Sequence, residues 1–339
     1  MKYSGFAVFA LIVVIVTVGY ARFGALKNLH PPKLNKPEPV IARVREVPVP
    51  PVFPVEVADA TGQTMLFQVA PKKIVSVAPS VTEVLFDLGL GDHVVADTNA
   101  CDFPQKATQL PHIGGAFDMD LEKIVSLQPD LVVADGTVNK QIILRMQAAG
   151  LKVFVMMPDT LEHCWESVRR LGRATGCTVE AAGLINDIRD HLENISRVVR
   201  QSPSTVKVMV LYDTATLYTS GPNTLIGELI KVCGGKNIAP SNDPLNSENV
   251  VEQAPEVIIC SSNLEANVAK MPGWKGTVPA VTNTAYFHTS ANATLIRPCR
   301  RMITGANELA KYLHPDVYTS DGRPAPFVKT GSTEGKPGK

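Results

Sequence analysis

Two glutamates, Glu122 and Glu248, occupy the same position in two copies of one sequence unit. The unit reads DLEKIVSLQPDLVVAD at 120–135 and NSENVVEQAPEVIICS at 246–261, an offset of 126 residues. Each glutamate falls in the first turn of an expected short helix, where a carboxylate is stabilised by the helix dipole. Other residues could serve that purpose, so we favour a second role. A matched pair of carboxylates could dock on two symmetric basic sites of a partner.

The histidines and cysteines show no metal-binding pattern. His112, His163 and His288 are scattered, and a lone histidine is more often structural than a ligand. The six cysteines include no CxxC pair and no zinc-like spacing. Cys101 lies in a loop near strand ends, where packing or a disulfide is the better interpretation. We expect no metal site; if the chain is exported, one or two disulfides of undefined connectivity could form.

Enzyme signatures are missing from the sequence. It has no GxxxxGK[ST], GxSxG or HExxH motif and no GxGxxG after a strand. The glycine pairs at 89–91 and 234–235 follow helical patterns, so they are interpreted as helix ends. We therefore expect no catalytic residue and no cofactor. The formal charge of +1 over 339 residues gives no reason to expect nucleic acid as a partner.

The repeated unit predicts two similar α/β lobes. In each copy Asp120 or Asn246 caps a short helix, a proline ends it, and an apolar run follows, as in a buried parallel strand. The first lobe is expected to have strands at 74–78, 94–98, 131–134 and 152–157 and helices at 81–88 and 140–149. The second is expected to have strands at 207–212, 217–219 and 257–260 and helices at 225–233 and 300–313. Helices at 161–175 and 179–199, broken near Gly176, are expected to connect the lobes.

The remaining segments complete the predicted organisation. The apolar run Phe6–Tyr20 is shorter than the about 20 residues of a membrane span, so residues 1–30 are interpreted as a signal peptide or a membrane anchor. No cysteine follows this run, so a lipoprotein anchor is not expected. A proline-rich spacer at 31–54 and a hairpin within 55–69 come next. The predicted domains are an N-terminal lobe at 55–160, a connector at 161–205, a C-terminal lobe at 206–315 and a disordered tail at 316–339.

Several of these motifs together resemble one family. The stretches IVSVAPSVTEVLFDLGLGDHVVADTNACDFP (74–104), IGGAFDMDLEKIVSLQPDLVVAD (113–135), YTSGPNTLIGELIKVCGGKNIA (218–239), SENVVEQAPEVII (247–259) and MPGWKGTVPAV (271–281) are similar to substrate-binding proteins of ABC importers for cobalamin and ferric siderophores. The resemblance covers residues 55 to about 314. It implies two Rossmann-like lobes joined by one long helix, as in class III periplasmic binding proteins, with the ligand between the lobes. It also implies that Glu122 and Glu248 engage arginines of the membrane permease.

The resemblance places ligand contacts in strand-end loops. The candidates are Pro79, Ser80, Phe103, Phe117, Asp118 and Asp135 in the first lobe, and Tyr218, Asn242, Ser261 and Arg297 in the second.

The aromatic residues of the expected ligand site depart from the family pattern. Cobalamin binders of this family present several large aromatics in the cleft, whereas Ala116, Asp135 and Asn242 stand at the matching positions here. Phe103 retains one aromatic, and Phe117 can substitute for its neighbour. Haem binders use a tyrosine near Gly115, and none is present. The only tryptophans, Trp165 and Trp274, are interpreted as core residues. Arg297 could pair with an anionic chelate or anchor the turn at Pro298.

The sequence therefore predicts an extracytoplasmic solute-binding protein that carries a corrinoid or another metal chelate to an ABC permease without catalysis. A ferric siderophore is the alternative ligand. Two other functions remain open. An enzyme or chelatase on the same frame would use Cys101, Asp118 or Asp135, and a tethered sensor would meet a partner other than a permease.

Overall fold

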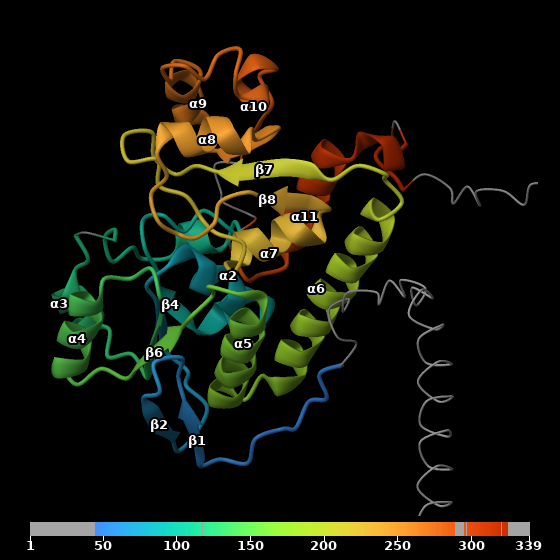
Figure 1. Ribbon diagram of the computed structural model, residues 1–339. Coiled ribbons are helices and arrows are strands. Elements are labelled where there is room, and N and C mark those ends of the chain that lie inside the picture. The colour runs from blue at the N-terminus through green and yellow to red at the C-terminus, as the bar shows by residue number, and fades with distance from the viewer. Residues whose placement is uncertain (1–44, 117, 289–294, 296, 320, 325–339) are drawn as a thin grey trace, which may run out of the picture. The chain divides into compact units, whose positions relative to one another are not determined.

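Two parallel four-stranded sheets form the centres of the two lobes in the computed structural model (Figure 1). The structure describes residues 45–116, 118–288, 295, 297–319 and 321–324. The expected signal peptide or anchor and the first part of the proline-rich spacer lie outside the described residues. No helix among the described residues has the length and apolar character needed to cross a membrane.

The two sheets share one topology. The first contains β3 (Ile74–Ser76), β4 (Val94–Ala96), β5 (Leu131–Asp135) and β6 (Val153–Met156), in the order β4-β3-β5-β6. The second contains β7 (Val206–Val210), β8 (Gly235–Asn237), β9 (Val257–Cys260) and β10 (Tyr286–His288), in the order β10-β9-β7-β8. Every neighbouring pair is parallel. When the second sheet is read from β8 to β10, the strands of both sheets lie in the same order: the second strand of the lobe, then the first, the third and the fourth. This confirms the prediction of two similar Rossmann-like lobes.

Helices alternate with these strands, as parallel pairing requires. The first lobe carries α2 (Pro79–Asp87), α3 (Leu121–Ser126) and α4 (Lys140–Ala148). The second carries α7 (Leu225–Val232), α8 (Ser247–Gln253), α9 (Ser262–Val268), α10 (Pro279–Thr282) and α11 (Arg301–Leu313). Each lobe has its own apolar core, around Val132 and Ile124 in the first and around Ile258 and Trp274 in the second.

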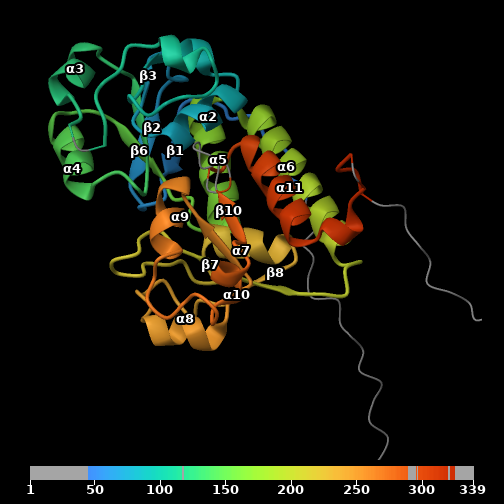
Figure 2. The same cartoon turned by 90° about the horizontal axis from the view of Figure 1, so that it is seen from above.

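Two long helices occupy the segment between the two sheets. Helix α5 (Leu161–Thr175) ends at Gly176, whose φ of 84° is left-handed and favours glycine, and α6 (Thr178–Val199) follows. Helix α5 packs on β1 and β6, whereas α6 packs against α5, α7 and α11. Figure 2 shows α11 beside α6. The connection between the lobes is therefore made by one helix of 22 residues.

The hairpin predicted within 55–69 is present. Strand β1 (Val55–Ala58) pairs antiparallel with β2 (Thr64–Phe67). The Asp59 carboxylate closes the turn by accepting hydrogen bonds from the backbone N–H groups of Thr61 and Gln63, at 2.8 and 3.0 Å. Gly62 takes a positive φ of 85° at the same turn.

The second lobe differs in detail from the prediction. The expected strand at 217–219 is wrong, because Leu217 has a φ of 52° and cannot continue an extended chain. This segment instead folds back, so that the Tyr212 N–H donates to the Tyr218 carbonyl at 2.9 Å. Sequence analysis did not predict strands β8 and β10 or helices α9 and α10. These elements are short, with three or four residues except in α9, so they carry little periodicity.

The C-terminal segment also differs from the expected disordered tail where it is described. Residues 315–317 form a short 3-10 helix, and Tyr318 bridges to Pro324. The Thr319 N–H donates to the Arg323 carbonyl at 2.7 Å. Residues 325–339 lie outside the described part of the chain.

Candidate functional site

The two copies of the repeated unit have the same local structure. The Asp120 side chain caps α3 by accepting from the Lys123 N–H at 2.9 Å. The Asn246 side chain caps α8 by accepting from the Asn249 N–H at 2.7 Å. In both copies the capping oxygen satisfies the third N–H of its helix, one of the groups that lack an intrahelical partner.

The ends of the two helices also match. Gln128 and Ala254, each directly before a proline, both adopt left-handed backbone conformations, with φ of 48° and 49°, so neither helix continues into the proline. The next carboxylate then joins the unit to the first strand of its lobe. Asp130 accepts from the Lys73 N–H at 2.9 Å, and Glu256 accepts from the Lys207 N–H at 2.8 Å. The repeat therefore extends beyond the helix to its attachment on the sheet.

These contacts give Glu122 and Glu248 equivalent places in the two lobes. Each is the second residue of its helix, α3 or α8, and each side chain is exposed. The arrangement offers two carboxylates to solvent, one from each lobe. Trp274 anchors the start of α8 to the core. Its ring is fully buried, and its Nε1–H donates to the hydroxyl of Ser247 at 2.7 Å.

The strand-end candidates of the first sheet include a buried polar pair. The Ser80 hydroxyl donates to one oxygen of Asp135, and the other oxygen accepts from the Thr137 N–H at 2.9 Å. Ser80 and Asp135 are 8% and 4% exposed. Their hydrogen bonds tie the start of α2 to the end of β5, and Pro79 begins α2 beside them.

The candidates of the second sheet lie around a tyrosine pair. The Tyr218 ring lies 5.8 Å from the Tyr212 ring, centroid to centroid, and the two side chains are 46% and 41% exposed. Burial of its hydroxyl end raises the pKa of Tyr212, and the Ser220 hydroxyl donates to that oxygen at 3.1 Å. Asn242 accepts from the Gly221 N–H at 2.7 Å and holds this loop. Sequence analysis missed Tyr212, although its place just after the apolar run of β7 could have marked it.

Phe103 and Arg297 belong to a third group, where the lobes meet. Phe103 is 44% exposed, and the guanidinium of Arg301 lies over its ring at 4.5 Å from the centroid. Arg297 bonds to Asp102 at 3.1 Å and to the buried Glu83 of α2. The sequence did not single out Glu83 or Arg301, and only a charged residue within an otherwise apolar α2 pattern could have drawn attention to Glu83.

The other candidates are more isolated. Asp118 is exposed and accepts from the Gly115 N–H at 2.8 Å. Ser261 is exposed at the start of α9. Phe117 lies outside the described residues. Among the described residues, the contacts given above join the candidates within each of the three groups and not between them.

The cysteines and histidines take structural roles. All six cysteines are free, so the disulfides considered for an exported chain are not formed. Cys101 is buried, with its Sγ 3.1 Å from the Thr82 hydroxyl oxygen, in agreement with the packing interpretation. His112 pairs with the buried Asp97 at 2.8 Å. Among the described residues, no cluster of histidine, cysteine and carboxylate side chains could hold a metal ion.

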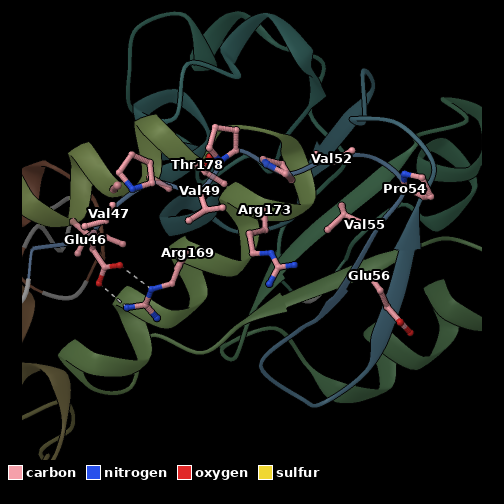
Figure 3. Close-up of a pocket in the computed structure, with 16 residues that line it drawn as sticks. Glu46, Val47, Val49, Val52, Pro54, Val55, Glu56, Arg169, Arg173 and Thr178 are labelled. Carbon is pink, nitrogen blue, oxygen red and sulfur yellow. Dashed lines mark hydrogen bonds and ion pairs between the residues drawn. The ribbon is translucent and has the colours of Figure 1, made fainter.

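A pocket of about 690 Å³ is lined by none of the candidate ligand residues (Figure 3). Its walls are the extended segment 46–56 and helices α5 and α6. Glu46 closes one end through Arg169, at 2.7 and 3.0 Å, and Arg189, at 3.0 Å. Asn186 exchanges two further hydrogen bonds with the Glu46 backbone. The end of the proline-rich segment is thus fastened to the connector helices.

The chain is similar to binding proteins of bacteria and archaea. It is 29% identical to an uncharacterized ABC transporter substrate-binding lipoprotein, YvrC, of Bacillus subtilis, over 79% of this chain and 88% of that protein. It is 29% identical to a cobalamin-binding protein of Halobacterium salinarum, over 77% of this chain and 74% of that protein. The structure of the periplasmic vitamin B12 binding protein BtuF of Vibrio cholerae matches with a TM-score of 0.61 and 25% identity, over 72% of this chain and 97% of that one. The family model for periplasmic binding proteins matches residues 74–293, and the chain belongs to this family.

Proposed function

We propose that this chain is the extracytoplasmic substrate-binding protein of an ABC importer and that its ligand is a corrinoid or a related metal chelate. The relatives include a cobalamin-binding protein and vitamin B12-binding proteins. The matched pair of exposed glutamates carries the proposal furthest, because a repeated, solvent-facing carboxylate on each lobe suits a partner with two symmetric basic sites. Binding and delivery, without chemical change of the ligand, account for both features.

The strand ends supply a suitable ligand surface. Phe103, Tyr212 and Tyr218 are all more than two-fifths exposed, although large aromatic rings are usually buried. Flat aromatic surfaces at the carboxyl ends of parallel strands can stack on a macrocycle such as a corrin ring. Tyr212 and Tyr218 would compensate for the aromatic residues that the sequence lacks at Ala116, Asp135 and Asn242. A ferric siderophore of similar size is the alternative ligand.

The proposal can be tested by titrating the purified full chain with cyanocobalamin and cobinamide and, separately, with ferric trihydroxamates. Intrinsic fluorescence and native mass would report the stoichiometry. Saturable 1:1 binding of a corrinoid, with unchanged ligand recovered afterwards, is expected. Turnover of the ligand would instead support the chelatase alternative, and the absence of binding to every chelate would contradict the proposal.

The partner can be tested in the same way. Co-expression with the ABC permease encoded nearest to this chain should give ligand uptake that depends on the chain. Ligand binding without any effect on uptake would favour the tethered sensor.

A further inference from the structure

The loops at the carboxyl ends of the strands are acidic. The segments 97–105, 135–139, 157–160, 211–224, 238–243 and 261–263 contain no lysine or arginine. They contain six aspartates: Asp97, Asp102, Asp135, Asp159, Asp213 and Asp243. Basic residues come directly after two of these segments, at Lys106 and Lys140, and Arg297 and Arg300 lie between β10 and α11.

Arg297, before α11, and Arg301, its first residue, bring positive charge to the loop that contains Asp102 and Phe103. Arg297 bonds to Asp102 at 3.1 Å, and Arg301 lies over Phe103. Their side chains are only 12% and 18% exposed. Both are therefore placed beside the expected ligand surface, yet neither is open to solvent.

Glu83 holds both arginines. Its Oε1 accepts from Arg301 at 2.9 Å and also from Arg297. Its Oε2 accepts from the Cys299 thiol at 2.8 Å. The Glu83 side chain is 2% exposed, and a carboxylate at that depth is stable only when it is paired and hydrogen-bonded.

The pairing engages both of these arginines within the protein. The negative charges of Glu83 and Asp102 balance the two positive charges of Arg297 and Arg301. The other aspartates of the loops add further negative charge. Burial lowers the pKa of Arg297, but the hydrogen bonds and charges of Glu83 and Asp102 together outweigh this effect, and the net shift of the pKa is upward. An anionic ligand would have to take an arginine from Glu83 and leave this buried carboxylate with one cation fewer, which is unfavourable.

We infer that Glu83 is a specificity-determining residue, which makes the ligand site accept neutral or cationic metal chelates and reject anionic ones. The inference rests on the proposed function, because it assigns a charge class to the ligand of that site. The inference also assigns Arg297 to an ion pair within the protein and not to the recognition of an anionic chelate.

The test compares two corrinoids that share one ring and differ in charge. Dicyanocobyrinic acid heptaamide carries neutral side-chain amides, and the heptacarboxylate carries negative charges at the same places. Dissociation constants would be measured with the full chain at low and physiological salt. The heptaamide should bind at least 100-fold more tightly than the heptacarboxylate. Glu83→Gln should reduce that ratio at least tenfold, mainly by improving carboxylate binding.

Matched variants separate specificity from folding. Asp87→Asn removes another α2 carboxylate, which pairs with Arg300 instead, and should keep the wild-type ratio. Arg297→Gln should not weaken carboxylate binding, and this variant keeps the inference testable if Glu83→Gln fails to fold. Circular dichroism would check each variant.

The outcomes distinguish the inference from the proposed function. Equal or tighter binding of the heptacarboxylate by the wild-type chain would overturn the inference and leave the proposed function in place. An unchanged ratio in folded Glu83→Gln would also overturn it. Failure of every corrinoid and ferric chelate to bind would remove the proposed function, and the inference with it.

Discussion

Glu122 and Glu248 stand at the same position of the same capped helix in two lobes. Asp120 and Asn246 cap their helices through equivalent backbone N–H groups, and Gln128 and Ala254 end them with nearly the same φ. Because local structure repeats this closely, the two carboxylates leave their lobes from equivalent backbone positions. This equivalence would suit docking of both glutamates on a partner with two symmetric basic sites.

The double variant Glu122→Arg with Glu248→Arg should abolish permease-dependent uptake and leave ligand affinity unchanged. The reversed charges would repel the basic sites that the glutamates are proposed to meet. Uptake by cells and affinity of the purified chain are the two measurements. Glu252→Arg makes the same charge change at an exposed position of α8 and should retain uptake. Loss of affinity in the double variant would count against docking.

Removing either helix cap should destabilise the protein by a similar amount. Asp120→Ala and Asn246→Ala each delete one capping hydrogen bond, which typically costs about 1 kcal/mol. Urea unfolding would measure the loss, and Asp120→Asn, which can still cap, is the control. A large difference between the two alanine variants would show that the copies are not energetically equivalent.

Tyr218→Ala should weaken ligand binding about 2- to 10-fold, since an aromatic contact contributes about 0.5–1.5 kcal/mol beyond its buried area. Tyr218→Phe keeps the ring beside Tyr212 and should bind like the wild type. Calorimetric titration would compare the variants. Unchanged affinity in the alanine variant would exclude the tyrosine pair from the ligand surface.

Glu46→Gln should destabilise the attachment of the extended segment, by about 1–2 kcal/mol at pH 7, because charge-assisted hydrogen bonds to Arg169 and Arg189 are lost. Release would appear as faster proteolysis within 46–54. Arg45→Ala breaks a pair whose side chains are 74% and 58% exposed, so it should have little effect.

The Glu46 contribution should depend on pH in a defined direction. The hydrogen bond from Arg169 lowers the pKa of the Glu46 carboxyl below its ordinary value of 4.5. A lowered pKa in the folded state stabilises the protein above the unfolded pKa, and this stability is lost as the pH falls through the folded pKa. The stability difference between wild type and Glu46→Gln should therefore be constant above about pH 5.5 and shrink below pH 4.5. A stability difference that grows as the pH falls would disagree with the ion pair.

Thiol labelling of the native protein should modify one cysteine much faster than the other five. Cys177 is partly exposed, and the other five are buried. Burial also raises the pKa of Cys260 to about 11, so its reactive thiolate is scarce at neutral pH. Cys177→Ser should remove the fast phase, and denaturant should expose all the remaining thiols. A second fast thiol in the native state would contradict the described burial.

The sequence by itself determined the two-lobed frame. The unit at 120–135 and 246–261 predicted capped helices and buried strands, because caps, prolines and apolar runs act through neighbouring residues. The end of the helix at Gly176 could be predicted for the same reason. The short strands β8 and β10 were not, since three residues carry too little periodicity.

Only the tertiary structure decided the partners of the charged residues. Glu83 and Arg301 are 218 residues apart, and their contact arises from the meeting of α2 with the start of α11. Glu46 and Arg169 likewise meet across 123 residues. Ion pairs of this kind leave no spacing in the sequence, because burial and three-dimensional proximity create them. The sequence thus predicted which loops could bind a ligand, and the tertiary contacts decided which charged side chains in and around those loops pair with one another.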